Sequence, residues 1–137
     1  MSGRIPKVRL DQEVVTVVLA MPDKHLSPNR PPASMGGRQR KARLTKAYRK
    51  ASRKATEELR VETGPWEQAT VRVVFYHAEK RRRDDVNFLG MLKPAYDGAV
   101  DARLLVDDDR DHLETLGATF EPDKAFPRVE LIYTRIR

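Results

Sequence analysis

Two groups of aspartates stand out in a chain that is otherwise strongly basic. Asp84 and Asp85 directly follow the four cations of the KRRR run, and Asp107 to Asp109 form a second group further along. Clustered carboxylates repel one another in a low-dielectric setting unless a cation lies among them. Mg²⁺ prefers oxygen ligands, usually one or two carboxylates together with water and substrate phosphate. The expected Mg²⁺ ligands are Asp84, Asp85, Asp107 and Asp108, with Mn²⁺ as the alternative ion.

Phosphodiester hydrolysis is the chemistry that such a site suits. The metal activates water and stabilises the charge that develops on the phosphorane, and a nearby lysine adds fixed positive charge. Lys93 is the candidate for that lysine, and Asp84 and Asp108 are the candidate catalytic carboxylates. An alternative for Lys93 is an i,i+4 surface pair with Asp97, which is worth only about 0.2–0.5 kcal/mol. An alternative for Asp84 is capping of a helix start, which leaves the later acidic group unexplained.

Length and composition bound the class of protein. The 137 residues suit one domain, 1–137. Because cysteine is absent, disulfides, thiolate zinc sites and cysteine nucleophiles are excluded. No apolar run approaches the roughly 20 residues of a membrane span, and the first residues do not resemble a signal peptide, so we expect a cytoplasmic protein. The glycine-rich phosphate loops are also missing, so no nucleotide cofactor is expected.

A basic helix is expected from about Arg40 to Arg60. Its apolar residues recur at three and four residue steps, which is the period of an amphipathic helix. The other face is cationic and contains no acid before Glu57, in a chain whose formal net charge is +7. Such a face suits a phosphate backbone, and the alternative is an exposed helix with solubilising charge. The predicted DNA-binding residues are Asn29, Arg40, Lys41, Arg43, Lys46, Arg49, Lys50, Arg53, Arg81, Arg82 and Arg83.

Four strands are expected around this helix. The β-branched run Glu13–Met21 is typical of a strand buried on both faces. Ala69–His77 alternates in the manner of a half-buried strand, and Trp66 just before it is expected to cover the core. His112–Phe120 and Arg128–Ile136 are expected to pair as a hairpin.

The remaining segments complete the expected fold. Residues 22–38 hold many prolines and glycines, which predicts a long, mobile loop. Val86–Leu104 has helical periodicity, and Pro94 either kinks this helix or starts a second segment. We therefore predict an α+β fold with the order β-α-β-α-β-β, in which two helices pack on a small mixed sheet.

The ordered motifs resemble those of the RusA family of Holliday junction resolvases. They are a strand followed by LSPN, a basic helix, RRRD with a nearby asparagine, LKPAYDG, and VDDDRDHL. The similarity extends from about Val15 to the last strand. It implies a small, phage or prophage encoded homodimer that binds four-way or branched DNA. It also implies symmetric cleavage of paired strands with Mg²⁺.

The resemblance assigns residues by position. The family's first acidic ligand, asparagine, lysine and late acidic pair resemble Asp84, Asn87, Lys93, Asp107 and Asp108. One position departs, because the family pattern D-x-D-N reads Asp84-Asp85-Val86-Asn87 and a valine cannot bind metal. Either Asp85 takes over, or the site keeps fewer carboxylates, or the protein binds junctions without cutting them efficiently.

Other functions stay open beside this one. One is a non-catalytic junction or nucleic-acid binding protein with a degenerate metal site, and another is a basic RNA- or ribosome-associated α/β protein. His25, His77 and His112 lack a metal-binding spacing, so structural roles are expected for them. His112 is the exception to watch, because it lies beside the second acidic group.

Overall fold

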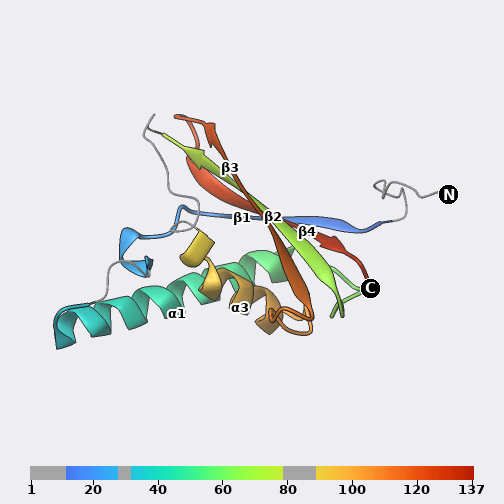
Figure 1. The fold of residues 1–137 in the computed structure, drawn as a ribbon, viewed down its shortest axis with the longest axis horizontal. Helices are drawn as coiled ribbons and strands as arrows, with labels where there is room; N and C mark the ends of the chain where they lie inside the picture. The colour runs from blue at the N-terminus through green and yellow to red at the C-terminus, as the bar shows by residue number, and fades with distance from the viewer. Residues whose placement is uncertain (1–11, 28–31, 79–88) are drawn as a thin grey trace.

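A computed structural model describes residues 12–27, 32–78 and 89–137 of the chain (Figure 1). The predicted α+β organisation is confirmed, with a four-stranded mixed sheet and two helices packed on it. The elements, in chain order, are β1 (Val14–Leu19), the 3-10 turn η1 (Lys24–Leu26), α1 (Met35–Glu58), β2 (Ala69–His77), α3 (Lys93–Asp101), β3 (Leu113–Pro122) and β4 (Arg128–Arg135).

The sheet has the strand order β1-β4-β2-β3. β4 pairs antiparallel with both β1 and β2, whereas β3 pairs parallel with β2. The predicted hairpin between β3 and β4 is therefore wrong, because β2 lies between them. The inward side chains of β2, such as Val71 and Phe75, are fully buried, so this strand takes a central place. The connection 123–127 crosses its end, where the amide of Asp123 donates to the carbonyl of His77 at 2.8 Å.

β1 is an edge strand of this sheet. Val17 and Leu19 are 1% and 6% exposed, but Val14 and Val18 on the other face are 50% and 43% exposed. The prediction of a strand buried on both faces is therefore wrong. A β-branched run reports strand propensity, and a sheet that carries helices on one side buries only alternate residues.

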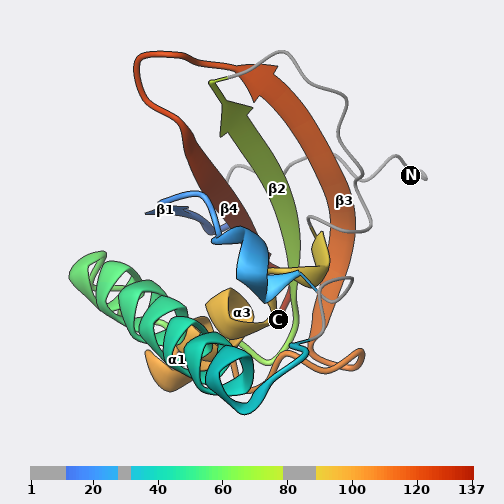
Figure 2. The same cartoon turned by 90° about the vertical axis from the view of Figure 1, so that its left-hand side faces the viewer.

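Both helices lie on the same side of the sheet, while the far ends of β2 and β3 extend beyond them (Figure 2). α1 and α3 cross at close range through small residues. The hydroxyl of Ser52 donates to the carbonyl of Ala95 at 2.6 Å. A Cβ on Gly98 would lie only 2.5 Å from the carbonyl oxygen of Arg49, so the contact depends on glycine at this position.

Trp66 anchors the segment that leads into β3. Its side chain is fully buried, which confirms its predicted place in the core. Its amide donates to the carbonyl of Leu104 at 2.7 Å, and its carbonyl accepts from the amide of Val106 at 3.0 Å. Its indole N–H donates to the hydroxyl of Thr63 at 2.9 Å. This pairing fixes where the chain enters the acidic segment that starts at Asp107.

Two predicted segments differ in detail. α1 begins at Met35, where the Ser34 hydroxyl accepts from the amide of Gly37 at 3.0 Å, so the end of the predicted loop 22–38 is helical. α3 begins at Lys93 with Pro94 in its first turn, which confirms that this proline starts a second segment. In the described ranges, no helix has the length and apolar character that crossing a membrane requires.

Candidate functional site

Lys93 is held between two carboxylates at the start of α3. Its Nζ donates to Oδ2 of Asp108 at 2.6 Å and to Oδ1 of Asp97 at 3.0 Å. Asp97 lies one helical turn after Lys93, whereas Asp108 comes from the segment before β3. The structure thus shows the i,i+4 pair and also brings the candidate lysine to one of the predicted metal ligands.

Asp108 is the more enclosed member of this contact. Its side chain is 10% exposed, and that of Lys93 is 64% exposed. The hydrogen bond to Asp108 is the main cause that raises the pKa of Lys93, and Asp97 adds to it. Lys93 is therefore a cation at neutral pH. Its side chain remains largely exposed to solvent although it contacts the enclosed carboxylate of Asp108.

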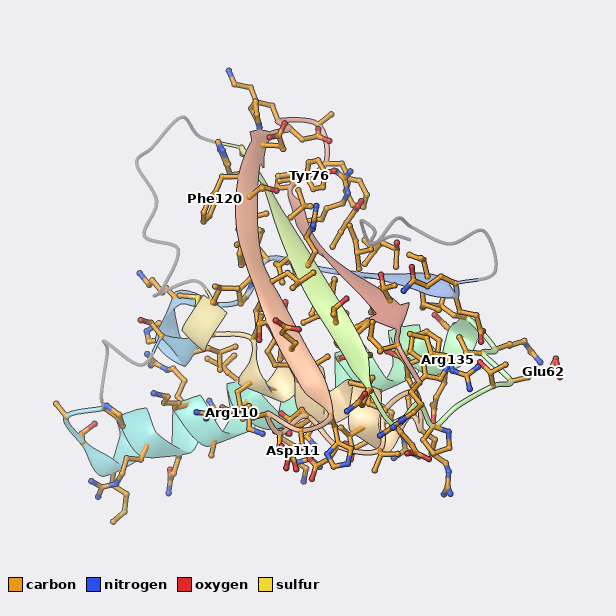
Figure 3. The ribbon with its side chains drawn as sticks, turned by 45° about the vertical axis from the view of Figure 1, so that its right-hand side comes forward. Glu62, Tyr76, Arg110, Asp111, Phe120 and Arg135 are labelled. Atoms are coloured by element: carbon orange, nitrogen blue, oxygen red, sulfur yellow. The ribbon has the colours of Figure 1, made fainter. Side chains whose placement is uncertain are left out.

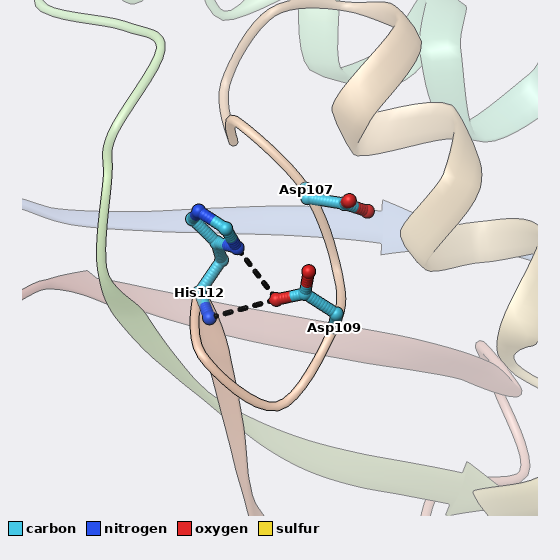
Figure 4. Close-up of side chains that lie close together, drawn as sticks. All are labelled: Asp107, Asp109 and His112. Carbon is cyan, nitrogen blue, oxygen red and sulfur yellow. Dashed lines mark hydrogen bonds and ion pairs between the residues drawn. The ribbon is translucent and has the colours of Figure 1, made fainter.

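The residues on either side of Asp108 shape the turn into β3. The amide of Asp108 donates to Oδ1 of Asp107 at 2.7 Å. Oδ1 of Asp109 accepts from the amide of His112 at 3.1 Å and lies 2.5 Å from its Nδ1 (Figure 4). This hydrogen bond raises the pKa of His112 and lowers the pKa of Asp109. Asp109, which was not among the predicted metal ligands, thus closes a tight turn.

Only some of the potential ligand atoms in this segment suit a hard divalent cation such as Mg²⁺. Ligand atoms of Asp107, Asp109 and His112 all lie within 4.8 Å of one another. Asp109 and His112 are already hydrogen-bonded to each other, and imidazole suits Mg²⁺ poorly. Asp108 is not a member of this cluster, so the roles predicted for Asp107 and Asp108 as metal ligands stay predictions.

Several predicted site residues cannot be compared with the structure. Asp84, Asp85 and Asn87 lie outside the described residues, as does Val86. The same holds for the predicted DNA contacts Asn29, Arg81, Arg82 and Arg83. The described part of the site is therefore its second acidic group and its lysine.

The acidic segment lies at the end of the sheet that the helices cover. Figure 3 shows Arg110 and Asp111, which follow Asp108 in the chain, at the opposite end of the sheet from Tyr76 and Phe120. The charges of Asp97, Asp101 and Asp108 all act on Arg49 of α1 and raise its pKa, the hydrogen bond from Asp101 being the largest cause.

Cationic side chains line two shallow grooves along α1. The first, of about 550 Å³, is lined by Pro32, Arg38, Lys41, Ala42, Thr45, Lys46 and Arg49. The second, of about 560 Å³, is lined by Lys46, Arg49, Lys50, Arg53 and Asp101. Grooves of this character suit the phosphates of a nucleic-acid backbone.

The cations of α1 fall into two classes. Arg49 donates through Nε and Nη2 to Asp101 at 2.6 and 2.8 Å, and Arg53 pairs with Glu57 at 3.0 Å. Lys46 and Lys50 form no ion pair within the described part of the chain.

The pairing of Arg49 with Asp101 of α3 could not be predicted from the sequence, because the two residues are far apart along the chain. Its predicted contact with DNA stays a prediction, and that contact would compete with Asp101.

Searches of protein-family models and of curated proteins found no match for this chain. The likeness to RusA resolvases therefore rests on the ordered motifs.

Proposed function

We propose that this protein is a Mg²⁺-dependent endonuclease that resolves Holliday junctions or other branched DNA by paired phosphodiester cleavage. The observation that carries the proposal is the contact between Lys93 and Asp108. A lysine that is permanently protonated lies 2.6 Å from a carboxylate that is 10% exposed. These two residues belong to the LKPAYDG and VDDDRDHL motifs, which resemble the catalytic motifs of RusA resolvases.

The roles of the residues follow from their chemistry. Asp107 and Asp108 would hold the ion, together with Asp84 and Asp85. When bound, Mg²⁺ supplies an activated water and neutralises charge on the scissile phosphate. Lys93 adds a fixed positive charge for the phosphate oxygens, which is worth most where the charge develops in the transition state.

Asp97 acts as a positioning residue in this scheme. It accepts a hydrogen bond from Lys93 at 3.0 Å and lies one turn further along the same helix. It therefore keeps the ammonium near the site even when Asp108 turns toward a cation.

The cationic face of α1 would hold the DNA. Lys46 and Lys50, which form no ion pair among the described residues, line the second groove beside Asp101. Each phosphate that they neutralise releases counterion, which supports binding that does not depend on base sequence. Cleavage of two strands related by symmetry needs two identical sites, so the proposal includes a homodimer.

A synthetic four-way junction tests this function. In Mg²⁺ the wild-type protein is expected to nick opposite strands, and Val86→Asp, which restores the family's D-x-D-N pattern, is expected to cut at least as fast. Asp108→Asn keeps the shape of the side chain but removes its charge, so it should bind the junction and cut at background. If neither wild type nor Val86→Asp nicks the junction, the nuclease function is excluded.

A second candidate is a junction-binding protein that does not cut. Two observations favour it: Val86 stands where a ligand is expected, and Lys93 already neutralises Asp108. Under this alternative, junction binding persists in a metal chelator, and Asp108→Asn binds as tightly as wild type or more tightly because repulsion of phosphate is removed.

A further inference from the structure

The two described helices, α1 and α3, lie on one side of the sheet and leave its other side as an open face (Figure 2). The open face consists of the alternate residues of each strand that point away from the helices. Examples are Val18 in β1, Ile132 in β4, Arg72 in β2 and Glu114 in β3, and their neighbours on the inner face include the core residues Val17, Leu131 and Val71.

Aliphatic side chains are exposed to water at both edges of this open face. Val14 and Val18 are exposed on the edge strand β1, and Ile132 of β4 pairs with Thr16 between them. On the other edge strand, β3, Leu116 is 47% exposed at the bulge where it and Gly117 oppose a single residue of β2. Exposed aliphatic groups that share one face are typical of a surface that another molecule covers.

The charge of the open face differs from the charge of the whole chain, whose formal value is +7. The open face has two arginines against three glutamates, a formal charge of −1, and it has no lysine. A nucleic-acid backbone or an anionic membrane binds a cationic surface, so the charge indicates a protein as the partner. The charged residues of the open face are Arg72, Arg128, Glu114, Glu121 and Glu130.

Two of these charges are arranged to suit a second copy of the same chain. Arg128 is already paired with Glu130 at 2.8 Å. Arg72 and Glu114 are exposed and form no ion pair with the described residues. They lie on neighbouring strands, since Glu114 pairs with Thr70, two residues before Arg72. A twofold axis that runs between them in the plane of an interface places Arg72 of each copy against Glu114 of the other.

We propose that two copies of this chain associate through the open face, sheet against sheet, with reciprocal pairs between Arg72 and Glu114. Sheets that pack face to face lie about 10 Å apart, a gap that long side chains from both sides can fill. Val18 and Leu116 would be covered in this contact. The grooves along α1 lie on the other side of the sheet and stay accessible in both copies. The inference rests on the proposed function only in taking the protein to be a homodimer.

Reversal of charge tests this interface in the full-length protein. Arg72→Glu places like charges against each other at both contacts, as does Glu114→Arg, and the double variant restores opposite charges. Lys54→Glu is the matched control, because Lys54 is exposed on α1 and lies away from the open face. Sedimentation equilibrium over a range of protein concentrations measures the dissociation constant of the dimer, and circular dichroism checks that each variant is folded.

The expected dissociation constants differ between these variants. Wild type and Lys54→Glu should dimerise equally well. Each single reversal should raise the dissociation constant at least about tenfold, because like charges then meet at two symmetric contacts. The double variant should return the constant toward the wild-type value. Val18→Ser, which leaves the charge unchanged at an exposed position, should also weaken the dimer.

Three results would overturn the interface. A wild-type protein that stays monomeric has no such contact, and a dimer that all these variants leave unchanged uses another surface. An Arg72→Glu variant that weakens junction binding but not the dimer would show that the open face binds DNA instead.

Junction cleavage separates the interface from the nuclease function. If wild type dimerises through the open face but cuts no junction, the interface stands and the nuclease function fails. If wild type cuts junctions as a monomer, the interface is overturned and the nuclease activity remains. If the monomeric single variants nick one strand without paired cuts, both proposals are supported.

Discussion

Arg49 on α1 holds Asp101 at the end of α3 through two parallel hydrogen bonds, Nε to Oδ2 at 2.6 Å and Nη2 to Oδ1 at 2.8 Å. Bidentate pairs of this kind fix direction as well as distance. The pair joins the basic face of α1 to the helix that carries Lys93. Arg49 therefore contributes first to the geometry of the site, whereas Lys50, its neighbour in the same groove, forms no ion pair with the described residues.

Arg49→Ala and Lys50→Ala should separate these two roles. Arg49→Ala is expected to lower the free energy of unfolding by up to about 1 kcal/mol, because the pair is partly exposed. Lys50→Ala is expected to stay within about 0.5 kcal/mol of wild type but to reduce the salt dependence of junction binding by about one phosphate contact. Urea unfolding and binding titrations over a range of salt measure both effects. An equal loss of salt dependence in Arg49→Ala would show that Arg49 leaves Asp101 to contact DNA.

Lys93 offers a second matched comparison. Lys93→Met leaves the enclosed carboxylate of Asp108 without its cation, so we expect a loss of about 1 kcal/mol in stability, limited because Lys93 itself is largely exposed. Asp97→Asn removes only the i,i+4 pair and should cost about 0.2–0.5 kcal/mol. Urea unfolding measures both. Junction cleavage should be abolished in Lys93→Met and only reduced in Asp97→Asn, and a Lys93→Met variant that still cuts the junction would contradict the assignment of Lys93 as the charge that acts on the phosphate.

The periodicity of the chain predicted the element order, but it could not predict strand pairing. Apolar alternation identifies a strand and its buried face, and the segment between Phe120 and Arg128 is also compatible with a hairpin. In the observed pairing β2 and β4 both take central places, and the inward side chains of both strands, such as Val71 and Leu131, are fully buried. Which strands become central is decided only in the assembled fold, and the sequence pattern of a single strand does not predict it.

The candidate site, like the sheet, could be predicted from the sequence only in part. Lys93 and Asp108 could be chosen by residue type and motif, but their contact depends on Trp66, which anchors the intervening chain.

Substitution of Gly98 tests whether the close contact between α1 and α3 contributes to stability. A Cβ at this position would lie 2.5 Å from the carbonyl oxygen of Arg49 and 2.6 Å from Cβ of Ser52, so Gly98→Ala should push the helices apart and cost about 1–3 kcal/mol. Gly36→Ala is the control, because the nearest atom to its Cβ is the Ser34 hydroxyl oxygen at 3.9 Å. This control should gain up to about 0.5–1 kcal/mol from helix propensity. Thermal or urea unfolding of the two variants gives the answer, and equal stabilities would show that the helices can separate without cost.

The Asp109–His112 pair predicts a pH dependence of the turn into β3. The pKa of His112 is raised above its usual 6.5, so its contribution to stability is complete below that pH and is lost as the pH rises through the raised value. The pKa of Asp109 is lowered from its usual 3.8, so its contribution is present above that pH and is lost as the pH falls through the lowered value. The pair therefore stabilises the fold most between these two usual values.

His112→Gln isolates this effect. The difference in unfolding free energy between wild type and His112→Gln should be larger at about pH 5.5 than at about pH 8.5, because the contribution of the pair falls as the pH rises through the raised pKa of the imidazole. Urea unfolding of both proteins at the two pH values measures it, and NMR titration of the His112 ring gives the pKa directly. A stability difference that is the same at both pH values would show that the contact with Asp109 does not depend on the charge of the imidazole.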